Sequence, residues 1–188
     1  TQLKSRNDYL IPGSSVKGVL RHHAEKILHH VGRDTNVDTL MGYAANGRSA
    51  EGQKSRFLVD EVYIKPAGVS LRPHVRNRID RFTSGVIGGA LFATEPIWQD
   101  NEDQAVAIIQ FSIREPQDWE VGLGLALFKD IATGRVAFGG EKGIGRGRMS
   151  LLSGAIYKDD TVYQLDANGH SDQDMSELDL YMQALINR

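Results

Sequence analysis

The sequence predicts an α+β fold in which two amphipathic helices cover one face of an antiparallel sheet. Three observations predict it: an amphipathic helix at residues 14–31, a second at 119–131, and strand-like segments that come between and after them. Helices interleaved with hairpin-connected strands are typical of α+β sandwiches. If one further strand precedes residue 1, the order becomes β-α-β-β-α-β, which is the ferredoxin-like arrangement.

Residues 14–31 form the first predicted helix because their apolar side chains recur at steps of three and four, as in a single buried stripe. We expect Ser14 or Ser15 to cap its N-terminus and Gly32 to end it. The stripe consists of Val16, Val19, Leu20, Ala24, Ile27, Leu28 and Val31.

Five segments are predicted strands, because they are rich in β-branched and aromatic residues. They are residues 56–64, 75–83, 90–98, 105–113 and 149–157. Ser84-Gly85 and Gly88-Gly89 separate the second and third segments, which predicts a hairpin there.

The rest of the chain contains a second helix, a loop and an acidic ending. Residues 119–131 have helical periodicity, weakened by Gly122 and Gly124. Residues 139–147 form a glycine-rich loop, residues 159–174 a polar, acidic excursion, and residues 176–186 a short terminal helix.

The composition excludes several function classes. The chain has 188 residues, 22 Lys and Arg, 24 Asp and Glu, a net charge of −2 and no cysteine. Disulfide frameworks, zinc ribbons and thiol catalysis are therefore excluded. Without a signal segment or a long apolar run, we expect a cytoplasmic protein that does not bind membranes. Residues 1–86 and 139–148 are nonetheless net basic, which suits a directed polyanion site.

The first candidate site opens the first helix. Pro12-Gly13 predicts a turn, and the free N–H groups of Ser14 and Ser15 can bind an anion at the helix N-terminus. Lys17 and Arg21 share one face of this helix. The alternative is a capped helix with a solvated basic face. The S-x-x-K spacing of Ser14 and Lys17 does not indicate a penicillin-recognising enzyme, because S-D-N and K-T-G are absent.

The second candidate is the basic segment 74–85. Strand alternation puts Arg76 and Arg78 on one face and Arg81 on the other. An arginine beside an aromatic ring at a glycine hairpin can bind a phosphate and stack on a base. The alternative is an edge strand whose arginines pair with Asp80 or Asp60.

The third candidate is the glycine-rich loop, where Lys142, Arg146 and Arg148 add positive charge to backbone that can approach a ligand closely. The loop lacks the Lys-Ser/Thr of a P-loop and the third glycine of a dinucleotide fingerprint. The alternative is a flexible solvated turn. No metal site is expected, because His22-His23 and His29-His30 lie about 10.5 Å apart along the helix.

In this order, the segments resemble the RAMP superfamily and, more narrowly, the backbone subunits or domains of type III CRISPR effector complexes. The resemblance covers residues 9–157 and rests on IPGSSVKGVLR, LMG, RFLVDEVYI, HVRNRIDRFTSGVIGGALF and GGEKGIGRGRM. It implies a modified RNA-recognition, ferredoxin-like domain at residues 1–157, with a hairpin thumb at about 75–98. Residues 158–188 are then an acidic extension with a short helix.

The resemblance also implies a function in antiviral defence. Such subunits stack in a filament with other subunits or domains along a guide RNA (crRNA). A thumb around residues 83–92, including Thr83, Ile87 and Phe92, kinks the duplex of guide and target RNA, and Ile87 and Phe92 are the wedge candidates. The implied contacts to RNA phosphates and the supports of the thumb are Ser14, Ser15, Lys17, Arg21, Arg76, Arg78, Arg81, Lys142, Arg146 and Arg148.

Many members of the family cut target RNA with an aspartate in the loop after the first strand. The family pattern places this loop, and the catalytic aspartate in it, upstream of residue 1, and Asp8 is the only acidic residue near it in the sequence. The resemblance implies a divalent cation for cleavage but no dedicated cofactor site. Two alternatives remain. One is a RAMP endoribonuclease that trims precursor guide RNA with His22, His23 or His74 as general base. The other is a domain that binds a protein or a small anion.

Overall fold

A computed structural model describes residues 2–33, 37–45, 51–104 and 106–187. The helices are α1 (Gly13–Val31), α2 (Val37–Met41), α3 (Asp118–Ala132), the 3-10 turn η2 (Lys142–Ile144) and α4 (Ser176–Ile186). The strands are β1 (Lys4–Ser5), β2 (Asp8–Ile11), β3 (Phe57–Val59), β4 (Val62–Ile64), β5 (Val69–Leu71), β6 (His74–Arg76), β7 (Phe92–Thr94), β8 (Ile97–Gln99), β9 (Phe111–Ile113), β10 (Gly154–Lys158) and β11 (Thr161–Leu165). These elements form two compact units.

The first unit, Thr1–Ile11 with Val62–Ile108, contains a small antiparallel sheet and a long hairpin. In the sheet, the order is β1-β2-β4, and Tyr9 of β2 faces Ile64 of β4. A strand therefore lies directly before α1 within the chain, where the sequence analysis expected one only upstream of residue 1.

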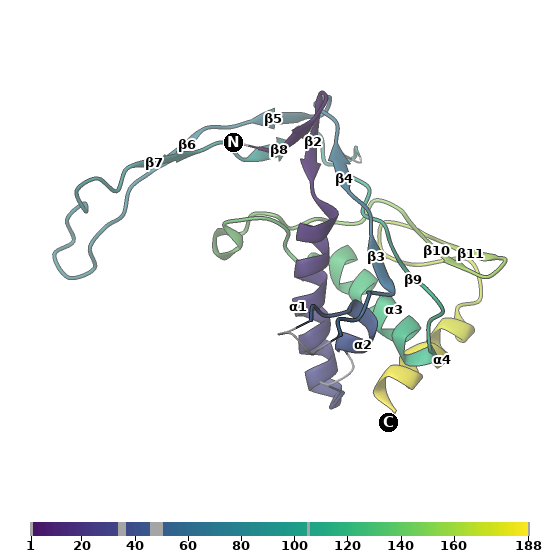
Figure 1. Cartoon of the computed structure of the whole chain (residues 1–188). Coiled ribbons are helices and arrows are strands. Elements are labelled where there is room, and N and C mark those ends of the chain that lie inside the picture. The colour runs from purple at the N-terminus through teal and green to yellow at the C-terminus, as the bar shows by residue number, and fades with distance from the viewer. Residues whose placement is uncertain (1, 34–36, 46–50, 105, 188) are drawn as a thin grey trace. The chain divides into compact units, whose positions relative to one another are not determined.

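The hairpin of the first unit, residues 69–99, is called the hairpin arm below (Figure 1). The β5–β8 ladder pairs Val69 with Gln99, and the β6–β7 ladder pairs Arg76 with Phe92. Both strands advance by the same number of residues between these pairs, so the register is continuous. Beyond them, Ile79 bridges Val86, and the additional residues on the returning strand form a turn that contains Gly89 at a φ of 74°.

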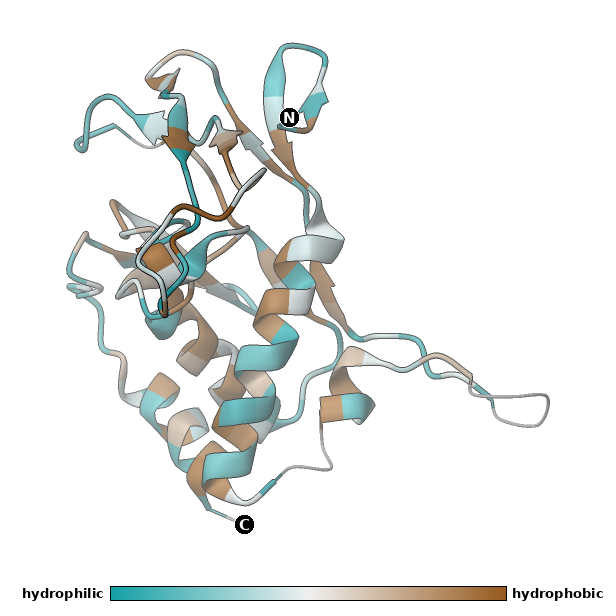
Figure 2. Cartoon of the chain, turned by 90° about the vertical axis from the view of Figure 1, so that its left-hand side faces the viewer, coloured by the Kyte–Doolittle hydropathy of each residue, from teal (hydrophilic) through white to brown (hydrophobic). Residues whose placement is uncertain are grey.

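The second unit, Pro12–Glu61 with Ile109–Arg188, contains the main core. One stripe of α1 is buried, and Figure 2 shows brown and teal residues sharing this helix, as expected for an amphipathic helix. α1 contacts α2, α3 and β3, where Phe57 stacks on Phe111 with ring centroids 5.2 Å apart. None of the described helices is long and apolar enough to cross a membrane.

The C-terminal segment packs onto α3. The backbone of Tyr181 in α4 comes so close to Gly122 that any side chain there would collide with it, which explains a glycine inside α3. Tyr163 and Leu165 of β11 are buried, and the Tyr163 hydroxyl donates a hydrogen bond of 3.0 Å to Glu177 of α4. Residues 158–188 thus lie within the second unit.

The helices agree well with the sequence predictions, and the strands agree less well. α1, α3 and α4 lie where they were predicted, and Gly32 ends α1 in the left-handed conformation. The predicted serine cap is wrong, because Pro12 occupies the N-cap position and no side chain caps the helix.

The predicted strands are shorter and fall into several small sheets. The segment 56–64 divides into β3, which pairs with β9, and β4, which pairs with β2. The predicted excursion at 159–174 contains β11, which pairs with β10. The mixed α and β class is therefore confirmed, whereas the described strands do not form one continuous sheet.

Candidate nucleic-acid interface

The entry to α1 is a tight turn with exposed serines. A side chain at Gly13 would place its Cβ 2.7 Å from the carbonyl oxygen of Val59, so only glycine fits beside β3. Ser15 and Val16 both donate backbone hydrogen bonds to the Pro12 carbonyl. The Ser14 and Ser15 side chains remain exposed on the first turn of the helix, where the positive end of the helix dipole favours an anion.

Lys17 and Arg21 differ in their surroundings although they share a helix face. Partial burial, and secondarily the charge of Arg21, lower the pKa of Lys17 below its usual value. Arg21 is held by protein groups: it pairs with Asp38, contacts Glu25 at 3.2 Å, and donates a 2.7 Å hydrogen bond to the Gly42 carbonyl. Arg21 therefore fixes α2 beside α1, a role that the sequence did not predict.

The glycine-rich loop is closed at its base. Phe138 donates a 2.8 Å backbone hydrogen bond to Gly147, and Ala137 bridges Arg148. Gly147 has a φ of 76°, and a Cβ at this position would overlap the Phe138 carbonyl, so this glycine is required by the loop closure. At the far end, η2 makes a short turn rather than an unstructured loop.

The three cations of this loop have different environments. Arg146 pairs with Glu141, and only 15% of its side chain is exposed. Lys142 and Arg148 are exposed, and neither forms an ion pair within the described part of the chain. Lys142 and Arg148 are thus the loop cations that are accessible to a phosphate. Arg146 stabilises the loop through its ion pair with Glu141.

The arginines of the hairpin arm lie beside aromatic rings. Arg76 donates a 3.3 Å hydrogen bond to Thr94, and its guanidinium lies 5.8 Å from the Phe92 ring centroid. Arg81 lies 4.9 Å from the Phe82 ring centroid. Arg78 is exposed, and among the described residues it has no ion pair, so its pairing with Asp60 or Asp80 is not observed.

The outer part of the hairpin arm exposes apolar side chains. The wedge candidates Ile87 and Phe92 are 43% and 42% exposed, whereas Phe82 is 85% exposed and Leu91 is 71% exposed. Thr83 accepts a hydrogen bond from Gly85 and shapes the turn. The sequence analysis did not select Phe82 or Leu91 as wedge candidates, although a phenylalanine next to an arginine at a glycine turn was a signal for one.

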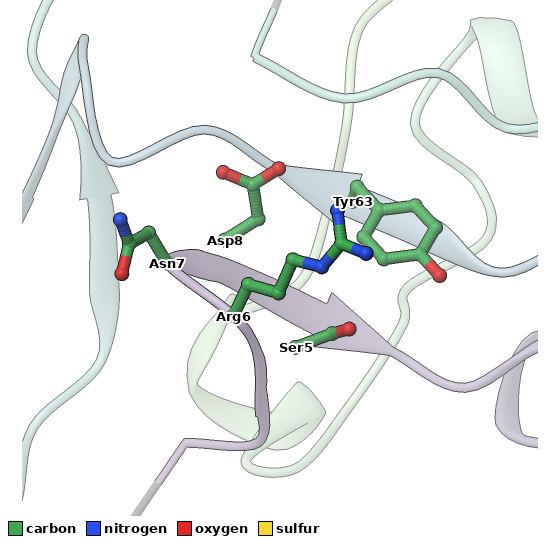
Figure 3. A pocket seen from close by; sticks show the side chains of 5 residues that line it. All are labelled: Ser5, Arg6, Asn7, Asp8 and Tyr63. Carbon is green, nitrogen blue, oxygen red and sulfur yellow. The ribbon is translucent and has the colours of Figure 1, made fainter.

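A small pocket surrounds the catalytic candidate Asp8 (Figure 3). It is lined by Ser5, Arg6, Asn7, Asp8 and Tyr63, and the Arg6 side chain extends toward Tyr63. Asp8 begins β2 opposite Ser5, and its carboxylate lies 3.4 Å from Lys65. Among the described residues, no group of three or more potential metal ligands lies close together.

The candidate histidines are tied to protein groups. His23 of α1 lies 2.7 Å from Asp130 of α3, which also contacts Arg135 at 3.3 Å, so this pair links the two helices. His22 lies 3.6 Å from Glu25 on the same helix. His74 lies beside Trp98, with ring centroids 5.8 Å apart.

The basic residues are distributed over both units. Residues of α1 and the glycine-rich loop belong to the second unit, whereas the hairpin arm and the Asp8 pocket belong to the first. Arg21 and Arg146 each pair with a carboxylate of the chain, with Asp38 and Glu141 respectively. Lys142, Arg148 and Arg78 are exposed. A common surface that joins all three segments stays a prediction.

Comparisons with known proteins relate the chain to one protein family and to chains of solved structures. The model of the RAMP superfamily matches residues 1–150. A chain of a solved "Type IV-B CRISPR Complex" has a similar fold, with a TM-score of 0.51 and 15% sequence identity, and the match covers 80% of this chain and 77% of that chain. A comparison with curated protein sequences finds no match.

Proposed function

The chain belongs to the RAMP superfamily, and from this premise we propose that it is a guide-RNA-binding subunit or domain of a CRISPR effector complex. One observation carries the proposal: the family match over residues 1–150 contains every predicted RNA contact. The CRISPR complex to which the structural neighbour belongs supports it through the shared fold. The proposed partners are guide RNA, target RNA and neighbouring subunits or domains in a filament.

The proposed contacts act on phosphates rather than on bases. Exposed lysine and arginine side chains that lack a carboxylate partner can release counterions when they meet RNA, and this release gives affinity without sequence preference. Lys142 and Arg148 in the glycine-rich loop and Arg78 in the hairpin arm have this character among the described residues. Ser14, Ser15 and Lys17 would add the anion-binding start of α1.

A finer proposal concerns the domain and the hairpin arm. In it, α1 and α3 with the β3–β9 pair form the ferredoxin-like, modified RNA-recognition core, and the hairpin arm is the thumb that kinks the guide–target duplex. The exposed Phe82, Ile87 and Phe92 support this role, because partially exposed rings and branched side chains can wedge between bases. The type III assignment rests on the sequence motifs, whereas the structural neighbour belongs to a type IV-B complex.

The most specific part of the proposal is that the chain cleaves target RNA. Its candidate is Asp8, and the chemistry would be attack of the RNA's own 2′-hydroxyl on the adjacent phosphate, which breaks the P–O5′ bond and leaves a 2′,3′-cyclic phosphate and a 5′-hydroxyl. A divalent cation would be brought by the RNA rather than held in a dedicated site. In the isolated chain the Asp8 carboxylate is paired with Lys65, so it would have to leave this ion pair to act in cleavage. The Asp8→Asn variant is expected to bind RNA as the parent does. Cleavage that survives this substitution would exclude Asp8.

A salt titration of RNA binding tests the main proposal. We expect log affinity for single-stranded RNA to fall steeply with log salt concentration. Replacing both Lys142 and Arg148 with alanine should reduce the slope by roughly 1.4, since each phosphate contact contributes about 0.7 on a single strand. The matched control is Lys129→Ala, an exposed lysine of α3 that lies outside the proposed contacts.

Two outcomes would contradict the proposal. A parent chain whose RNA affinity is negligible or independent of salt would favour a domain that binds proteins or small anions. A double variant that loses affinity for one RNA sequence only would show base recognition rather than phosphate binding.

A further inference from the structure

We propose that one face of the hairpin arm is a stacking surface for unpaired RNA bases, centred on Trp98 and Arg72. The inference rests on the proposed function and specifies which part of the RNA this face binds. It concerns the inner part of the hairpin arm, away from the exposed tip.

The continuous register of the arm gathers five side chains on this face, because alternate residues of a strand share a side. The Arg72 guanidinium lies 5.3 Å from the Trp98 ring centroid. The His74 ring lies 5.8 Å from the same indole at an interplanar angle of 36°. The Arg76–Phe92 pair continues the face toward the tip. The stacking face is defined as Arg72, His74, Arg76, Phe92 and Trp98.

Local contacts hold the centre of this face in position while leaving it accessible. The Arg72 Nε donates a 3.4 Å hydrogen bond to the Ser70 hydroxyl, and its guanidinium lies 3.8 Å from Asp100. Ser70 in turn donates to Asp100 at 2.7 Å. Nevertheless the Arg72 side chain is 54% exposed and Trp98 is 38% exposed. A preorganised, accessible pair of guanidinium and indole is a good surface for a base, because little side-chain freedom is lost on binding.

The repetition of these pairs favours a nucleic acid as the ligand. Arg72 and Arg76 are four residues apart on the strand, which is about 13 Å, and each lies next to an aromatic ring. A single strand of RNA presents bases and phosphates in alternation, so it can stack on the rings and neutralise the arginines together. Along the β5–β8 and β6–β7 ladders, the opposite face has Leu71 and Val75 on the outgoing strand and carries no such pair among the described residues, whereas the Arg81–Phe82 pair lies beyond these ladders.

The second tryptophan of the chain provides an internal control. The chain contains 2 tryptophans, and Trp119 of the second unit also lies beside an arginine, with Arg33 at 5.8 Å from its ring centroid. Its indole N–H donates a 2.7 Å hydrogen bond to Gln117. Trp119 therefore reports general effects of RNA on fluorescence without belonging to the stacking face.

The experiment uses the full chain with one tryptophan at a time. The Trp119→Phe variant reports on Trp98, and the Trp98→Phe variant reports on Trp119. Each is titrated with a single-stranded oligouridylate and with the corresponding abasic ribose-phosphate oligomer. We expect the oligouridylate to quench Trp98 but not Trp119, and the abasic oligomer to quench neither. The stacking face is unmodified in the Trp119→Phe variant, so the signal of Trp98 does not depend on the folding of a variant at Trp98.

An affinity measurement completes the test. We expect the parent to prefer the oligouridylate over the abasic oligomer by about tenfold, the lower part of the range for one stacked base. Trp98→Ala should abolish this preference and leave affinity for the abasic oligomer unchanged. Leu71→Ala, on the opposite face, is the matched control and should preserve the preference.

The outcomes separate the inference from the proposed function. Salt-dependent binding of both oligomers with equal affinity and an unquenched Trp98 would overturn the stacking face and leave phosphate binding intact. A chain that binds neither oligomer would overturn both proposals.

Discussion

The hairpin arm and the helical second unit use the same residue types for different purposes. In the second unit, Arg33 lies over Trp119 and also donates to the backbone carbonyls of Ala184 and Asn187, so it joins α3 to the end of α4. In the hairpin arm, Arg72 lies over Trp98, and its other contacts are the neighbouring Ser70 and Asp100. The Arg33–Trp119 pair thus connects separate elements of the second unit, whereas the Arg72–Trp98 pair lies on an accessible face of the hairpin arm.

The distribution of apolar side chains shows the same difference. Leu123 and Leu127 of α3 are fully buried, whereas Phe82 and Leu91 of the hairpin arm are mostly exposed. Exposed apolar groups that cluster on one segment mark a surface for binding rather than for stability. We therefore expect the second unit to provide most of the stability, and the hairpin arm and the glycine-rich loop to bind the ligand.

The largest effect is expected from a core truncation. Leu127→Ala should lower the free energy of unfolding by about 3 kcal/mol, because it leaves a cavity beneath α3. Phe82→Ala, its counterpart in the arm, should change this free energy by less than about 0.5 kcal/mol. Urea denaturation measures both. If Phe82→Ala destabilises the chain as much as Leu127→Ala does, the arm belongs to the core and the comparison fails.

A smaller effect is expected at the glycine-rich loop. Gly147→Ala should cost about 2 kcal/mol in the closed loop, since φ is positive and the added methyl group overlaps Phe138. RNA affinity should fall with it, because Lys142 and Arg148 are displaced. Gly140→Ala is the matched control, since a Cβ there meets open space. Filter binding checks both variants, and equal affinities for the two would show that loop closure does not position the cations.

The sequence predicted the helices well because their signals are local. The bounds of α1 follow from the apolar stripe and Gly32, and α4 lies at the predicted short terminal helix. Strands depend on distant partners, so the strand-like segment 56–64, in which Asp60 and Glu61 interrupt the apolar residues, did not show that β3 and β4 pair with different strands. The residues of β11 do not alternate strictly between exposed and buried, and its acidic flanks favoured a loop prediction.

The candidate site was predictable by segment but not by side chain. Glycines and cations identified the loop at 139–148, yet the inward pairing of Arg146 with Glu141 depends on the loop conformation. The engagement of Arg21 with Asp38 likewise depends on how α2 packs, which no local pattern records. Trp98 was not selected, because its partners Arg72 and His74 come from the other strand of the arm.

The smallest effect is expected at Lys17, whose pKa is lowered chiefly by burial. A lysine with a folded pKa below its unfolded value of 10.5 costs stability while charged, and this cost disappears as pH rises through the lowered pKa toward 10.5. Lys17→Met should therefore stabilise the chain at neutral pH, by up to about 0.5 kcal/mol. The gain should shrink in alkaline solution. Denaturation at several pH values measures it, with the exposed Lys26→Met as control; a destabilising Lys17→Met would show that its charge has a partner.

Hydrogen exchange of the full chain with and without single-stranded RNA tests the division between binding and stability most directly. The account predicts that RNA slows backbone amide exchange in the hairpin arm and in the glycine-rich loop, and leaves α3 and α4 unchanged. Slowed exchange confined to α3 and α4, with the arm and the loop unaffected, would contradict it.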